Sequence, residues 1–324
     1  MQPHPHRCSP PRPARLAAGV LALALGLAGC AELPPATTAP ATPSPAALPE
    51  PGVAPRSPSS EAMRVHFAQV EAAMRAKGML RTELQPQDAP FNAATLTENF
   101  IRIALYDEYQ TAGGLYVARE TAARLRRWQA PVRMALEFGA SVPLAQRNAD
   151  RITLGSTANR LANASGHSVS VSAQNPNFTV MVLNEDERRA IGPRLAALVP
   201  GIDAATLRAV TNMPDSTYCM VFAFSQGNSG VYTRAIAVIR GEHPDLLRQS
   251  CFHEELAQGM GLANDSPAAR PSIFNDDEEF ALLTRHDDHL LRILYDPRLH
   301  PGMTEAEARP IVSTIANALL GGTS

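Results

Sequence analysis

The stretch CFHEELAQGMGLAN, residues 251–264, carries polar side chains at helical spacing. Glu254 and Gln258 are four residues apart, so they share one face of a helix at a rise of about 6 Å. Glu255 lies beside them, and Asn264 follows six residues after Gln258. The pattern predicts a helix over 246–262 that ends at Gly261 or just beyond it.

The spacing of these residues resembles a metallopeptidase motif. The pattern E-E-x-x-Q-x-x-G-x-x-N, which starts at Glu254, is similar to H-E-x-x-H-x-x-G-x-x-H, the zinc site of metzincins. The resemblance puts Glu254, Gln258 and Asn264 at the three ligand positions. It puts Glu255 at the general base and Gly261 at the turn that follows the helix.

Other segments extend the resemblance over about residues 125–300. Residues 272–274 read SIF and resemble the metzincin Met-turn, with Phe274 where methionine is usual. Residues 282–297, LLTRHDDHLLRILYDP, look like the closing helix of matrixin-type metzincins. Residues 132–139, VRMALEFG, resemble the first strand of that fold, and residues 230–240 take the place of its edge strand.

Three strings resemble a bacterial family more closely. They are EELAQGMGLANDS, SIFND and LLRILYDPRLHPGM, and they resemble the family called domain of unknown function 2927. That family carries no known activity. The metzincin resemblance implies a zincin-like fold, and the order of the expected strands and helices indicates an α+β class with one mixed sheet packed by helices. The family itself implies no chemistry.

The altered ligand positions argue against zinc chemistry. Zinc in hydrolases takes nitrogen or sulfur donors, whereas this chain offers one carboxylate and two amides at the three ligand positions. Amide oxygens suit calcium better, but calcium needs six or more oxygens. Without a metal, water beside Glu255 keeps a pKa near that of bulk water. We expect no cofactor, with weak zinc or calcium binding left open.

His253 offers a further nitrogen ligand for such a site. Together with Glu254 it begins an H-E-x-x-H motif, but Ala257 stands where the second histidine belongs. A single histidine near a helix start more often caps or packs. A hydrolase that uses Glu255 as base remains an alternative, with its metal held by Glu254, Gln258, Asn264 and His253.

The first sixty residues differ in composition from the rest of the chain. The chain has 324 residues and 28 prolines, of which 14 fall in residues 1–60. Residues 1–29 combine arginines, an apolar run and small residues, which indicates a signal peptide. The string LAGC at 27–30 resembles the lipobox of bacterial lipoproteins, which implies cleavage before Cys30 and lipid on its sulfur. Residues 30–60 predict a proline-rich tether, and residues 61–324 one domain.

Cysteine usage fits an exported chain. Of the four cysteines, Cys8 leaves with the signal peptide and Cys30 takes lipid. Cys219 and Cys251 remain in an oxidising compartment, where a disulfide between them is expected. A free, catalytic Cys251 is the alternative.

The expected elements alternate before the closing helices. Helices are predicted over 62–76, 95–110, 118–128, 144–164, 185–198, 204–210, 246–262, 283–295 and 304–320, and strands over 132–138, 168–172, 178–183, 218–224 and 230–240. The acidic run 276–279 reads as the first turn of a helix or as a calcium site. His286 and His289 read as a solvated face or as replacement ligands.

These patterns predict a cell-envelope lipoprotein on the periplasmic face of the outer membrane. Ala31 after the lipobox cysteine favours that membrane by analogy with lipoprotein sorting. The domain is expected to bind an envelope protein or peptide along the edge strand near 231–239. A structural envelope spacer is a further alternative. The net charge of −2 and an aromatic content of 5% argue against nucleic acid as a partner.

Overall fold

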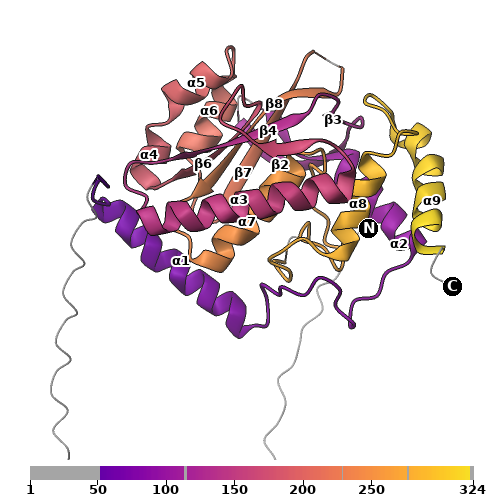
Figure 1. Cartoon of the computed structure of the whole chain (residues 1–324), viewed down its shortest axis with the longest axis horizontal. Helices are drawn as coiled ribbons and strands as arrows, with labels where there is room; N and C mark the ends of the chain where they lie inside the picture. The colour runs from indigo at the N-terminus through magenta and orange to yellow at the C-terminus, as the bar shows by residue number, and fades with distance from the viewer. Residues whose placement is uncertain (1–51, 113–114, 228, 276, 322–324) are drawn as a thin grey trace, which may run out of the picture. The chain divides into compact units, whose positions relative to one another are not determined.

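The fold is built around a mostly parallel sheet (Figure 1). The computed structural model describes residues 52–321 without 113–114, 228 and 276, and only the backbone over 108–120. Five strands run parallel in the order β3, β8, β6, β4 and β5, and β7 pairs antiparallel with β8. Their bounds are Arg127–Trp128 (β3), Val132–Phe138 (β4), Val169–Val171 (β5), Phe178–Leu183 (β6), Cys219–Ser225 (β7) and Val231–Arg240 (β8).

Both faces of this sheet are covered by helices. The central strand β6 reads FTVMVL and is buried at every position, as expected for a strand with two covered faces. Val180 and Val182 join one apolar core, whereas Met181 and Leu183 join another on the opposite face. The helices on the first face are Leu144–Ser165 (α3) and Asp245–Gln258 (α7), and those on the second are Glu185–Arg189 (α4), Gly192–Leu198 (α5) and Ala204–Thr211 (α6).

The remaining helices complete the unit beside the sheet. Figure 1 shows α2, α8 and α9 together near the carboxyl end of α3, and α1 below α7. Their bounds are Pro58–Ala76 (α1), Ala93–Ala104 (α2), Arg285–Leu294 (α8) and Glu305–Gly321 (α9). All described residues belong to one compact unit, 48–324. The α+β class predicted from the sequence is confirmed.

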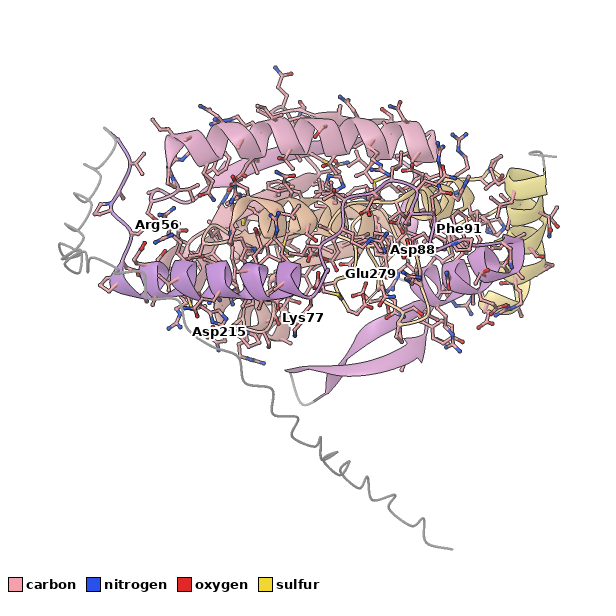
Figure 2. The ribbon with its side chains drawn as sticks, turned by 90° about the horizontal axis from the view of Figure 1, so that it is seen from below. Arg56, Lys77, Asp88, Phe91, Asp215 and Glu279 are labelled. Carbon is pink, nitrogen blue, oxygen red and sulfur yellow. A yellow bond between two sulfur atoms is a disulfide. The ribbon has the colours of Figure 1, made fainter. Side chains whose placement is uncertain are left out.

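Most predicted elements appear near their predicted bounds, although the helix expected over 185–198 is divided into α4 and α5 and the helix expected over 246–262 ends at Gln258. The largest errors lie in the region before β4. The helix expected over 95–110 ends at Ala104, and no helix covers 118–128. Instead, Tyr106–Ala112 (β1) and Leu115–Ala122 (β2) form an antiparallel hairpin. Figure 2 shows this hairpin projecting from the body of the unit.

The edge strand was also assigned wrongly. Residues 230–240 were expected at the edge, but β8 lies between β6 and β7. The edge beside α7 is β7 itself. Both strands are mostly apolar, so their composition does not distinguish the inner strand from the outer one.

Four charged side chains fasten the loop before α8. Arg81 and Arg270 each contact both Asp88 and Glu279 at 2.6–2.8 Å, and Figure 2 labels the two acids. The arginines hold the pKa of both carboxyl groups below its usual value. The acidic run does not begin a helix as predicted, because α8 starts only at Arg285.

The predicted signal peptide, lipidation site Cys30 and most of the tether lie outside the described residues. Within the described part of the chain, no helix has both the length and the apolar character needed to cross a membrane.

Candidate functional site

The helix that carries the metzincin-like pattern follows the longest strand of the sheet. β8 ends at Arg240, and α7 runs from Asp245 to Gln258 under β7 and β8 and beside α3. Phe252 and Leu256 are fully buried in the core between this helix and the sheet. The packing of these apolar positions fixes the rotation of α7 and hence the direction of its polar residues.

A disulfide joins the edge strand to this helix. Cys219, the first residue of β7, bonds to Cys251 in α7 with 5.8 Å between the Cα atoms. The predicted pairing is confirmed. A catalytic Cys251 is thereby contradicted, because a thiolate is needed for nucleophilic attack.

The two glutamates of the pattern lie at this junction. Carboxylate oxygens of Glu254 and Glu255 and the sulfur of Cys219 all lie within 4.8 Å of one another. Glu255 is 3% exposed, whereas Glu254 is partly exposed. The sulfur is engaged in the disulfide, so this group offers two carboxylates as possible ligands.

The other two ligand positions are engaged elsewhere. The amide of Gln258 donates to Asp265 Oδ1 at 3.2 Å. Asn264 is buried, and its side chain donates to the Arg102 carbonyl oxygen at 2.9 Å, at the end of α2. Asp265 was missed in the sequence, although it directly follows the pattern.

The donor set does not fit a tetrahedral zinc site. Two adjacent carboxylates supply oxygen only, and the amide that should complete the set holds α2 instead. Zinc sites in hydrolases are built from three well-directed ligands that are mostly imidazoles.

Gly261 makes the turn after α7 in a way that other residues cannot. Its φ of +126° is strained for residues with a side chain, and a Cβ would stand 2.3 Å from the Arg126 carbonyl oxygen. Two aromatic donors hold the same turn. Trp128 Nε1 donates to the Gly259 carbonyl at 2.8 Å, and the Tyr295 hydroxyl donates to the Met260 carbonyl at 2.9 Å.

His253 faces the loop before α8. Its Nδ1 accepts a hydrogen bond from the Leu283 backbone N–H at 3.3 Å. Burial, reinforced by the charge of Arg160, lowers the pKa of His253 to about 4. The side chain is therefore neutral near pH 7 and serves as an acceptor, in agreement with the packing interpretation.

Phe274, at the predicted Met-turn position, is fully buried in the core that also contains Leu256. The loop around it is held by Asp287, which accepts hydrogen bonds from the Ser272 hydroxyl at 2.5 Å and the Ile273 N–H at 3.2 Å. These contacts give the loop a structural role beneath α7.

The histidines of α8 do not form the solvated face predicted for them. His286 is 0% exposed, and its Nε2 lies 3.0 Å from the Asn99 side-chain amide. His289 is partly exposed, and its ring packs against Phe91 with 5.9 Å between the centroids.

Comparisons with known proteins give one match. No curated protein and no solved structure matched the chain. The sequence model described as protein of unknown function (DUF2927) matches residues 93–314, which span the sheet, α7 and most of α9. The chain therefore belongs to the DUF2927 family.

Proposed function

We propose that the protein is a lipid-anchored protein of the cell envelope that binds an extended peptide along β7. The domain uses a metzincin-like scaffold without zinc chemistry. The resemblance at residues 254–264 supports this scaffold, as does an edge strand beside the helix that carries the pattern. The lipobox-like string that ends at Cys30 supports the anchor.

The observation that carries the proposal is that no second strand runs along the outer side of β7 in the part of the chain that the structure describes. Among the described residues, β8 is the only strand that pairs with β7, and every residue of β7 is half-buried. An edge strand presents a row of backbone donors and acceptors to which an extended peptide can add. The disulfide at Cys219 fixes this edge to α7.

The position of β7 over α7 gives the bound peptide a defined neighbour. Val221 and Ala223 face the core shared with α7, whereas Met220 and Phe222 face the core on the other side of the sheet. A peptide added to β7 would lie beside the carboxylates of Glu254 and Glu255, which adjoin Cys219. Backbone hydrogen bonds would supply affinity, and the side chains of α7 would supply selectivity.

The peptide proposal can be tested with a displayed library of random heptapeptides and two proline variants. Successive N–H groups of a strand point to opposite sides, so one of Val221→Pro and Phe222→Pro removes an outward N–H and the other removes a bond to β8. The variant that keeps its fold by circular dichroism should lose about tenfold in affinity for selected peptides. Unchanged affinity in that variant would contradict binding at β7.

A metal-dependent hydrolase is the second candidate, favoured by the two neighbouring carboxylates of Glu254 and Glu255. The protein is dialysed against zinc, calcium and manganese, and bound metal is measured by mass spectrometry. We expect no tightly held equivalent. One equivalent that is lost in Glu254→Ala, together with a peptidase activity lost in Glu255→Gln, would replace the first proposal by the second. If neither metal nor peptide binds, a role as a structural spacer gains support.

A further inference from the structure

Two adjoining hollows lie along α8. One has a volume of about 780 Å³ between α3 and α8, and the other has about 500 Å³ beside residues 84–91. They share Arg285, His289 and Leu319 and so form one continuous depression. None of its lining residues belongs to β7 or α7.

The larger hollow carries excess positive charge. Arg160 is paired with Asp288 at 3.0 Å. Arg285 and Arg292 have no acidic partner among the described residues. The guanidinium of Arg292 instead donates to the carbonyls of Asn163 and Ala164 at 3.3 and 3.0 Å. The one carboxylate on this wall, that of Asp288, pairs with Arg160, so the guanidinium groups of Arg285 and Arg292 are complementary to an anionic ligand.

The opposite wall, on α3, carries neutral hydrogen-bonding side chains. Ser156, Asn159 and Asn163 are exposed and line the hollow at helical spacing. The two asparagines are four residues apart, which corresponds to a rise of about 6 Å. Alternate peptide groups of an extended chain repeat at about 6.6 Å. Side-chain amides can both donate to and accept from such groups.

The smaller hollow has a mixed lining, in which apolar side chains lie beside Gln85 and Gln87. Phe91, Leu84 and Leu319 line it, and Leu84 is 45% exposed. Arg285 stands at the junction of the two hollows, and Arg292 lies seven residues further along α8. The rise between the arginines is about 10 Å, which three residues of an extended chain span.

We propose that this depression binds an acidic peptide in an extended conformation. An apolar side chain of the peptide occupies the hollow at Phe91, and two carboxylates three residues apart pair with Arg285 and Arg292. Asn159 and Asn163 bind its backbone. This site goes beyond the proposed function and is independent of the edge of β7.

The test uses the full-length protein and a fluorescent nonapeptide that carries a leucine near its amino end and two aspartates three residues apart. A matched peptide with asparagines in place of the aspartates is the neutral control. We expect Arg285→Ser and Arg292→Ser each to weaken binding of the acidic peptide about five- to tenfold, since each removes one charge-assisted contact. Arg75→Ser, which removes an equally positive side chain from α1, should leave binding unchanged.

The decisive variant is Arg285→Ser, because the described residues give its guanidinium no hydrogen bond to lose. Wild-type affinity in this variant, or equal binding of the neutral peptide, would overturn the proposal. Binding to phosphatidylglycerol vesicles is measured for the same variants. Arginine-dependent binding of these vesicles without binding of the peptide would identify a membrane surface instead and would also overturn it. A proline variant of β7 that no longer binds the peptides selected for that strand should keep its affinity for the acidic nonapeptide.

Discussion

Gly261 shows at the scale of one residue why a pattern can persist when its chemistry does not. The glycine allows the backbone to turn at a φ of +126° directly against Arg126. Asn264, three residues later, ties the same segment to the end of α2. Both residues therefore have a structural role that does not depend on a metal.

We predict that Gly261→Ala destabilises the fold by about 2–4 kcal/mol, because the new Cβ meets the Arg126 carbonyl in a strained conformation. Urea unfolding measures the change. Gly155→Ala is the control, since a Cβ there contacts nothing within 4 Å in the interior of α3. It should raise the free energy of unfolding by about 0.5–1 kcal/mol. An equal effect of the two substitutions would refute this account of the turn.

His253 predicts how stability depends on pH. Its folded-state pKa of about 4 lies below the value of about 6.5 in the unfolded chain, so the unfolded state binds more protons between these values. Stability is therefore lost as the pH falls through this range. From pH 7 to pH 5 we expect this group to cost about 1–2 kcal/mol.

His253→Asn keeps an acceptor for the Leu283 N–H but cannot be protonated. Its unfolding free energy should fall less steeply than that of the wild type as the pH drops, as measured by urea unfolding at each pH. His66→Asn, at an exposed position of α1, is the control. The comparison with wild type is needed because burial raises the pKa of Glu278 to about 7, and that group shifts stability in the opposite direction. Parallel pH profiles for wild type and His253→Asn would contradict the prediction.

At the scale of elements, hydrophobic periodicity predicted the strands whose bounds depend on which of their faces are buried. β4 and β6 were placed at their observed bounds, because alternating or continuous apolar residues fix which faces are buried. The hairpin β1–β2 was missed. Its strands read YDEYQTA and LYVARETA, in which polar residues do not alternate strictly with apolar ones, so the period that predicts a strand is absent. Pairing of β7 and β8 depends on contacts distant in sequence, so the true edge could not be identified locally.

We predict that α1 stays bound to the rest of the unit after the chain is cut behind it. Lys77 is the only lysine of the chain and is exposed directly after the helix. A lysine-specific protease should cut there once. The fragment 1–77 should nevertheless stay bound to 78–324 in gel filtration. Phe67 is fully buried, and Ser60 donates to the buried Glu242 at 2.8 Å.

Phe67→Ala should release the cut fragment, because loss of a buried phenylalanine costs about 3–5 kcal/mol. Val65→Ala is the matched control, since Val65 is 47% exposed on the same helix. Dissociation of the cut wild-type protein would contradict the prediction, because it would show that packing alone does not hold α1 in place.

At the scale of the whole molecule, the membrane anchor is a prediction from the sequence. Cys30→Ser removes the sulfur that would carry lipid, so the variant should move from the membrane to the soluble fraction after cell fractionation. Ser59→Ala, which removes an exposed hydroxyl that donates to Asp186 and leaves Cys30 in place, serves as the control. Membrane association of the Cys30→Ser variant would count against the lipoprotein proposal.

At the candidate site, the spacing of residues along α7 could be predicted from the sequence, but the contacts of their side chains could not. Spacing placed Glu254 and Gln258 on one helical face with Glu255 beside them, because helical periodicity is a local property. It did not show that the strand beside them, β7, is the edge of the sheet. It did not show that Asn264 faces α2 or that Gln258 bonds Asp265. Those directions depend on how the chain returns after Gly261, which involves segments about 160 residues apart.

The disulfide between Cys219 and Cys251 affects when, during its maturation, the protein can bind ligands at β7. Thiols stay reduced in the cytosol, whereas disulfides form after export. If the chain is exported as proposed, β7 is fixed to α7 only on the far side of the inner membrane. Before export, pairing with β8 would hold β7 without the covalent link to α7, so binding at this edge would be weaker until the disulfide forms.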